Sequence, residues 1–174
     1  FEADGATAIA GTFTVSSGTY DANDNTTTVT GLATINGGAT YLAGSDTQTF
    51  NGGLAISGTM TGAGGAINVN VTFTLGAGGS IAAGSGAITI TADSVDLGST
   101  ANTIGGTGTI TLQPTTVTRP IVLGAAGTAS DFALDTAELS ALTDGFSSIT
   151  IGRDNGEHAI TISAVTFNDP VTIR

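Results

Sequence analysis

The stretch that decides the fold of this chain runs from Ala66 to Leu97 and opens with the pattern Ile67-Asn-Val-Asn-Val-Thr-Phe-Thr-Leu75. Large apolar residues alternate there with Asn and Thr, so a strand of period two would place every large apolar side chain, Val71 included, on one face. A glycine-rich corner at residues 76–79 ends this strand, and a second alternation begins at Ile88. The sequence therefore predicts short strands joined by corners of small residues.

Units made of an apolar residue, threonine and an apolar residue recur along the chain with a shared period. Three of them begin eleven residues apart, at Ile149, Ile160 and Val171, and Ile88 and Ile110 are separated by twice that interval. A coil with rungs of about 20 residues and two or three short strands per rung fits these spacings. The repeat favours a solenoid of stacked, parallel strands.

The main rival to the solenoid is an antiparallel meander. Asn155 and Gly156 lie between alternating strands and form the strongest short signal for a hairpin turn. Glycine-rich corners without an Asn-Gly pair are the commoner joint in this chain, which favours the solenoid. Parallel pairing between successive rungs would decide between the two folds.

Only one segment predicts a helix, near residues 136–142. Asp135 is a good N-cap, and Glu138 follows three residues later, as in a capping box. Leu134 can also pack against Leu139 across the start of the helix. We expect about two turns of helix that leave the stack and return to it.

The composition is strongly acidic and excludes several classes of partner. Fourteen Asp and Glu residues face three Lys and Arg residues, which gives a formal net charge of -11. A surface of this sign repels phosphate backbones and anionic lipid headgroups, so we predict no nucleic-acid partner and no membrane-surface partner. No apolar run approaches the length needed to span a bilayer, so we also predict no membrane insertion. The chain has no cysteine, which excludes disulfides, thiol catalysis and zinc-thiolate sites. The start at Phe1 lacks the basic residues of a signal peptide, so the targeting segment of a secreted form would lie outside these residues.

The most polar run of the chain offers Asp21, Asn23 and Asn25 as candidate calcium ligands. They have the spacing of the first three ligands of a calcium loop, but position six is Thr26 instead of Gly and position twelve is Leu32 instead of Glu. An Asx-rich turn without a ligand is the better interpretation. Calcium at this corner stays the alternative, and the sequence suggests no other cofactor.

No group of residues predicts catalysis. His158 is the sole histidine and follows the Asn155-Gly156 turn, where a solvated side chain is favoured over a general base. Asp93 and Asp96 could form a carboxylate pair of the kind that glycosidases use, but an odd offset on a strand would place them on opposite faces. The three arginines are scattered and lysine is absent, which argues against a polysaccharide lyase. We therefore predict no catalytic residues and no enzyme.

Thr-x-Thr units raise the question of ice binding. They begin at Thr47, Thr59, Thr72, Thr89 and Thr109, and each would point two hydroxyl groups outward. An ice-binding face needs a ladder that aligns from rung to rung, and these irregular starts argue against one. Threonine is also the polar residue best suited to the outer face of a strand.

From Gly105 onward the sequence resembles a known family. The segments Gly108–Pro114, Ile121–Gly124, Leu139–Arg153 and Val165–Ile173 are similar to repeats of filamentous-haemagglutinin-type surface proteins of bacteria. Members of that family are secreted, right-handed parallel β-helices that serve as adhesins or extracellular fibres, often through two-partner secretion. The resemblance implies an extracellular or cell-surface location, a structural or adhesive role, and no catalytic residues. The family's amino-terminal secretion cap is missing, so the chain looks like a segment of a longer protein.

Together these observations predict one all-β domain over residues 1–174, a right-handed parallel β-helix or solenoid with rungs of about 20 residues. Its expected function is a structural or adhesive segment of an extracellular bacterial fibre or surface adhesin. Copies of itself, or adjacent rungs, are the expected partners at its ends, while the sequence leaves any host or cell-surface ligand open. A carbohydrate-active β-helix, lyase-like or hydrolase-like, is the alternative, and an ice-binding solenoid is the third.

Overall fold

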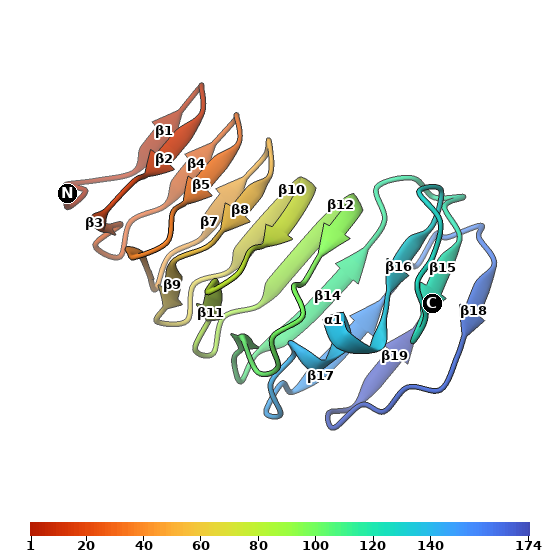
Figure 1. Cartoon of the computed structure of the whole chain (residues 1–174). Helices are drawn as coiled ribbons and strands as arrows, with labels where there is room; N and C mark the ends of the chain where they lie inside the picture. The colour runs from red at the N-terminus through yellow and green to blue at the C-terminus, as the bar shows by residue number, and fades with distance from the viewer.

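The computed structural model describes all residues, 1–174, and consists of parallel strands stacked as a solenoid (Figure 1). Ile67 pairs with Ile88 and Ile88 pairs with Ile110, so these rungs are 21 and 22 residues long. Each strand pairs with its neighbours in parallel, including the pairs that flank Asn155 and Gly156. The parallel pairing confirms the predicted solenoid and excludes the meander.

The first face of the solenoid carries eight strands, which follow one another in chain order. They are β1 (Thr7–Ile9), β4 (Thr27–Val29), β7 (Gln48–Phe50), β10 (Ile67–Leu75), β12 (Ile88–Asp96), β14 (Thr109–Gln113), β17 (Ser148–Ile151) and β19 (Val171–Ile173). The eleven-residue interval of the sequence is half a rung, because Ile149 pairs with Val171 while Ile160 lies on another face.

The second face also has eight layers, but the last three do not follow chain order. The first five are β2 (Phe13–Val15), β5 (Ala33–Ile35), β8 (Leu54–Ile56) and the carboxyl-terminal halves of β10 and β12. The last three, in spatial order, are β16 (Phe132–Leu134), β15 (Ile121–Leu123) and β18 (Ile160–Ile162). After β15 the chain thus turns back and places β16 between β12 and β15 (Figure 1).

The third face is a five-stranded sheet, extended by one isolated bridge. Its strands are β3 (Gly18–Asp21), β6 (Ala39–Gly44), β9 (Thr59–Gly62), β11 (Ser80–Ala82) and β13 (Ile104–Gly105). The bridge joins Ile104 to Leu142, which follows the only helix. The chain therefore rejoins the stack directly after its helical excursion.

Strand β10 turns a corner that the sequence did not predict. Its amino-terminal half pairs with β7 and its carboxyl-terminal half with β8, so one strand contributes to two faces. At the corner Val71 has a φ angle of 75° and a side chain that is 61% exposed. The prediction that Val71 shares the buried face of Ile67 and Phe73 is therefore wrong, because the period of two holds only on each side of the bend.

Helix α1 (Thr136–Ser140) has the predicted capping box but is shorter than predicted. The Asp135 carboxylate accepts a hydrogen bond from the Glu138 amide at 2.9 Å, and the Glu138 carboxylate accepts one from the Asp135 amide at 3.0 Å. The helix ends at Ser140 instead of residue 142 because Leu142 already pairs with Ile104. No helix of this protein has the length and apolar character needed to cross a membrane.

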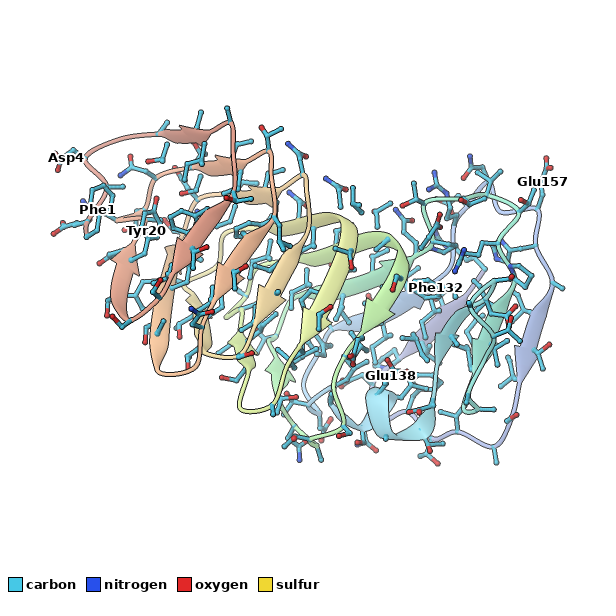
Figure 2. All side chains as sticks on the ribbon, turned by 45° about the horizontal axis from the view of Figure 1, so that its top comes forward. Phe1, Asp4, Tyr20, Phe132, Glu138 and Glu157 are labelled. Carbon is cyan, nitrogen blue, oxygen red and sulfur yellow. The ribbon has the colours of Figure 1, made fainter.

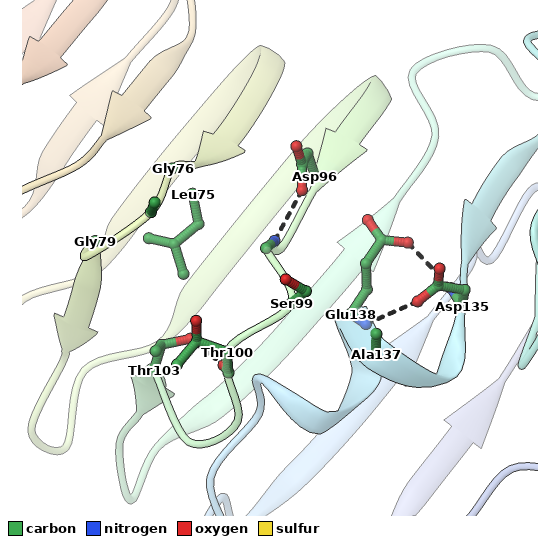
Figure 3. A pocket seen from close by; sticks show the side chains of 12 residues that line it. Leu75, Gly76, Gly79, Asp96, Ser99, Thr100, Thr103, Asp135, Ala137 and Glu138 are labelled. Carbon is green, nitrogen blue, oxygen red and sulfur yellow. Dashed lines mark hydrogen bonds between the residues drawn. The ribbon is translucent and has the colours of Figure 1, made fainter.

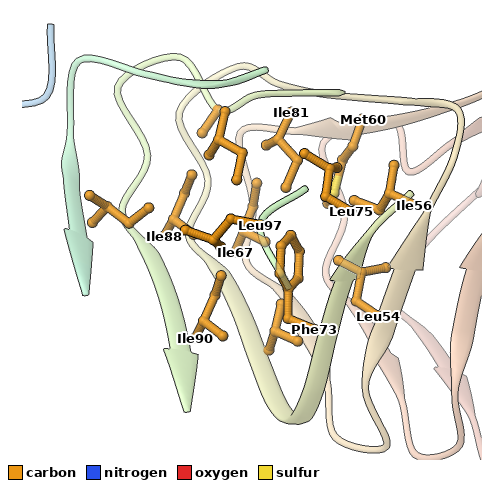
Figure 4. Close-up of a cluster of buried hydrophobic side chains, with 14 of the residues drawn as sticks. Leu54, Ile56, Met60, Ile67, Phe73, Leu75, Ile81, Ile88, Ile90 and Leu97 are labelled. Atoms are coloured by element: carbon orange, nitrogen blue, oxygen red, sulfur yellow. The ribbon is translucent and has the colours of Figure 1, made fainter. Parts of the chain in front are cut away.

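The core is one continuous apolar column that runs along the axis of the solenoid. It contains 36 buried residues, and Figure 4 shows its central part, where Ile67, Phe73 and Ile88 meet. Two polar residues, Thr27 and Gln48, are also fully buried, and Gln48 forms the larger hydrogen-bond network. Its Oε1 accepts a 2.6 Å hydrogen bond from the Tyr41 hydroxyl, and its Nε2 donates to the carbonyls of Asn25, Ala43 and Asp46 at 2.8 to 3.0 Å. The two N–H groups of Gln48 thereby serve three backbone carbonyls at one corner, with one hydrogen shared between two of them.

Candidate functional site

The candidate calcium residues form a turn with its own hydrogen bonds. Asp21 Oδ1 accepts from the Asn23 amide at 2.8 Å, and Asn25 Nδ2 donates to the Asn23 carbonyl at 2.8 Å. The side-chain amides of Asn23 and Asn25 also donate to the Ala3 carbonyl, at 3.3 and 3.4 Å. Asn23 and Asp24 have positive φ angles of 50° and 55°. These contacts are those of an Asx-rich turn, in which the polar side chains hold the backbone.

The expectation that Asp93 and Asp96 lie on opposite faces is wrong, because β12 also bends. Ala92 and Val95 both face the core, so Asp93 and Ser94 lie outside between them, and Asp96 is exposed as well. The two carboxylates nevertheless have separate partners. Asp93 accepts from the amide and hydroxyl of Thr116, at 2.8 and 2.6 Å, while Asp96 accepts from the Gly98 amide at 2.8 Å.

The pKa of Asp93 is lowered by its surroundings. Burial raises this pKa, but the hydrogen bonds from Thr116 and the nearby positive charge of Arg119 outweigh that effect. A carboxylate that stays ionised and holds a loop has the properties of a structural anchor.

His158 lies between two backbone carbonyls. Its Nδ1 is 3.1 Å from the Val117 oxygen, and its Nε2 is 3.0 Å from the Arg174 oxygen. Both ring nitrogens are within hydrogen-bond distance of a carbonyl oxygen, so the side chain lies between the loop before β15 and the end of β19. This contact brings together residues that are 41 and 16 positions from His158 in the chain.

A polar pocket of about 420 Å³ lies beside helix α1 (Figure 3). Asp96, Asp135 and Glu138 line it, and Figure 3 shows Glu138 next to Asp135. Burial raises the pKa of Glu138, and the negative charges of Asp135 and Asp96 raise it further. A glutamate with a raised pKa in a pocket is typical of a general acid. Here, however, both carboxylate oxygens accept backbone hydrogen bonds, from the Leu97 amide at 3.4 Å and the Asp135 amide at 3.0 Å. These bonds favour a structural role for Glu138 over that of a general acid.

The sequence predicted only the capping role of Glu138. Leu97, its second partner, is 41 residues away, and no local pattern connects the two residues.

A column of outward-facing side chains crosses all eight strands of the first face. We call it the threonine column. In pairing order its members are Ala8, Thr28, Thr49, Asn68, Thr89, Thr111, Thr150 and Thr172. The neighbours of each member along its strand point into the core, so the column lies on the outer surface.

A second column lies two residues further along the strands and is fixed by hydrogen bonds between rungs. Asn70 Nδ2 donates to Asn51 Oδ1 at 3.0 Å, and Gln113 Nε2 donates to Thr91 Oγ1 at 2.9 Å. Asn70 pairs with Thr91, and Thr91 with Gln113. The threonine column contains no charged or aromatic residue, and the second column holds one charged residue, Arg174, at its carboxyl-terminal end.

Both ends of the solenoid expose apolar side chains. At the amino-terminal end Phe1 is 82% exposed and stacks on Tyr20, with ring centroids 5.6 Å apart (Figure 2). At the other end the inward-facing residues Ile160, Ile162 and Val171 are 39%, 54% and 38% exposed. Equivalent positions within the stack are buried, so it is the absence of a covering layer that exposes these side chains.

Comparisons with known proteins give no relative on which an assignment could rest. No family model matches the chain, and neither the curated proteins nor the solved structures contain a match.

Proposed function

We propose that this chain is a structural or adhesive segment of an extracellular bacterial fibre, in the manner of filamentous-haemagglutinin-type surface proteins. Further rungs, from the same polypeptide or from a second copy, would cover the ends of the solenoid. One observation carries the proposal: each end presents two outermost strands side by side, and the inward positions of the strands at one end would continue those at the other.

The ends are level because β16 is inserted into the second face. With this extra strand both long faces have eight layers, so β18 and β19 are both outermost at the carboxyl-terminal end. At the amino-terminal end β1 and β2 are both outermost. Each end therefore presents two strand edges side by side, and unpaired strand edges are templates for further strands.

The side-chain patterns of the two ends continue one another. In β19 Val171 and Ile173 face inward, and in β1 Thr7 and Ile9 do so. A next layer with β1 on β19 would thus place Ile9 over Ile173 inside the stack, Thr7 over Val171, and Ala8 over Thr172 in the threonine column. In the same layer β2, with Phe13 and Val15 inward, would lie on β18. Such a contact buries the side chains that each end leaves exposed.

The few positive charges of the chain all lie in its carboxyl-terminal part. All three arginines of the chain lie between residues 119 and 174, and Arg174 follows β19 directly. Glu2 and Asp4 precede β1, and residues 1–118 contain no Lys or Arg. Residues 119–174 nevertheless contain seven Asp and Glu residues, and the Arg174 guanidinium is paired with the Asp154 carboxylate, so both halves are net negative and charge does not select head-to-tail stacking.

Electron microscopy and sedimentation of the purified chain at high concentration test this function. We expect rods of constant width whose length grows with protein concentration. Ile162→Asp and Val171→Asp should shorten the rods, because each substitution places a charge in the predicted contact between layers. Val71→Asp is the matched control, since Val71 is exposed in the middle of the solenoid.

A monodisperse monomer with rapid amide exchange in β1 and β19 would contradict end-to-end stacking. Equal shortening by Val71→Asp would also contradict it. Turnover of an acidic polysaccharide by the purified chain would favour a carbohydrate-active β-helix instead.

A further inference from the structure

The irregular spacing of the Thr-x-Thr units hides an aligned ladder. The unit at Thr59 belongs to β9 on the third face, and the unit at Thr72 belongs to the second face. The units at Thr47, Thr89 and Thr109 all lie on the first face, where each contributes to the threonine column. The expectation that the Thr-x-Thr units do not align is therefore wrong for the first face, because the irregular spacing comes from units that lie on different faces.

The threonine column is a long, regular array of hydroxyl groups. Six of its eight members are threonines, one from each of six strands. Paired strands lie about 4.8 Å apart, so neighbouring hydroxyl groups repeat at that interval along the axis. Threonine is β-branched and has few χ1 rotamers, which fixes each hydroxyl group with little loss of entropy on binding.

The second column widens this array into a flat surface. It is offset by two residues along the strand, or about 6.6 Å. Its hydrogen bonds from Asn70 to Asn51 and from Gln113 to Thr91 hold side chains of successive rungs together. The surface thus repeats in two directions and is ordered before any ligand arrives.

Charge is absent from the threonine column and is confined to Arg174 at one end of the second column, although the protein has a formal net charge of -11. Acidic side chains such as Asp21, Asp46 and Asp93 lie at corners or in loops. A neutral surface does not select ionic polymers, and without aromatic rings it lacks the groups that commonly line sugar sites. What it offers is a lattice of neutral donors and acceptors.

The partner that uses such a lattice must itself be periodic. A small soluble ligand would contact one or two rungs and would gain nothing from the remaining layers. A crystalline surface of water repeats in two dimensions, and its molecules both donate and accept hydrogen bonds. Contacts at many rungs then add up in one binding event, as in multivalent binding. We propose that the threonine column and its neighbouring column bind ice.

The test measures thermal hysteresis and inhibition of ice recrystallisation by the intact chain. We expect activity for the natural sequence and, for the double variant Thr89→Tyr and Thr111→Tyr, a loss of about tenfold or more, because two bulky rings in mid-column prevent contact at neighbouring rungs. The matched control is Thr40→Tyr with Thr59→Tyr. These two residues pair with one another on the third face, and their variant should keep full activity.

Circular dichroism checks that each variant folds. If the tyrosine variants unfold, Thr89→Asn with Thr111→Asn replaces them, because Asn68 already occupies one position of the column. The asparagine variant should have less activity than the control variant of the third face. Its loss should be smaller than the loss expected for a folded tyrosine variant. No activity in the natural chain, or equal losses in the control and the column variants, would overturn the proposal. Rod growth is measured separately, so failure on ice leaves the fibre function standing.

Discussion

Glu138 and Leu97 are joined by a hydrogen bond between the Leu97 amide and Glu138 Oε1, with an N to O distance of 3.4 Å. The other oxygen of the same carboxylate accepts the Asp135 amide at 3.0 Å. Leu97 directly follows β12, and Asp135 directly follows β16. These two strands are neighbours on the second face without forming a ladder, so Glu138 connects them where backbone pairing is missing.

Glu138→Ala should destabilise the protein by about 1–2 kcal/mol, because it removes a helix cap and leaves two partly buried amides without an acceptor. Urea unfolding measures the change in the free energy of unfolding. Glu157→Ala is the control, since Glu157 is exposed and its side chain forms no hydrogen bond with the protein. Equal effects of the two substitutions would show that the connection has no energetic role.

The raised pKa of Glu138 gives its contribution a definite pH dependence. Folding favours the protonated carboxyl group of Glu138. Its contribution to the free energy of unfolding is therefore full below the ordinary pKa of 4.5 and is lost as pH rises through the raised pKa of the folded state. The free energy of unfolding of the natural chain, relative to that of Glu138→Gln, should therefore fall as pH increases above 4.5. A difference that grows with pH in this range would contradict the sign of the shift.

Gln48→Leu should cost about 3 kcal/mol, because it leaves the Tyr41 hydroxyl and three backbone carbonyls without their buried partner. Tyr41→Phe removes only one bond of this network and should cost less. In a double-mutant cycle the two effects should not add, since both remove the same Tyr41 to Gln48 hydrogen bond. Additive losses in thermal or urea unfolding would contradict direct coupling.

Gly86→Ala should destabilise the stack by about 1–3 kcal/mol, because overpacking forces neighbouring backbone apart. A methyl group on Gly86 would collide with the carbonyl oxygen of Gly65, one rung below. Gly108 stands in the same relation to Gly86, so this corner is a column of glycines in close contact. Gly5→Ala is the control, as nothing lies within 4 Å of the added carbon. The melting temperature of Gly86→Ala should be lower than that of Gly5→Ala.

Local patterns predicted the parts of the fold that local forces determine. The alternation in Ile67–Leu75, the interval from Ile88 to Ile110 and the capping box at Asp135 all have their predicted structural meaning. Val71 was misplaced because a bend without Gly or Pro leaves no mark in the alternation. The neighbouring strand bends at Asp93 in the same way, through one extra residue.

The features that the sequence did not reveal depend on contacts between distant rungs. Rungs differ in length, and corners absorb the difference, so the alignment of Thr49, Thr89 and Thr111 appears only once the strands are paired. Gln48 occupies an inward position, although the alternation of apolar and polar residues predicts no polar side chain at such a position. Ile121 and Phe132 are eleven residues apart, the same interval that separates Ile149 on the first face from Ile160 on the second. Ile121 and Phe132 nevertheless pair with one another on the second face.

The fold-back at β16 also determines how the molecule can assemble as it emerges from a ribosome or a secretion pore. Through β12 each newly released segment finds its neighbour already in place. Beyond that point β15 emerges eleven residues before β16, the strand that must lie beneath it. Zippering from the amino terminus must pause there until Leu134 is released, which makes this layer the natural checkpoint of folding.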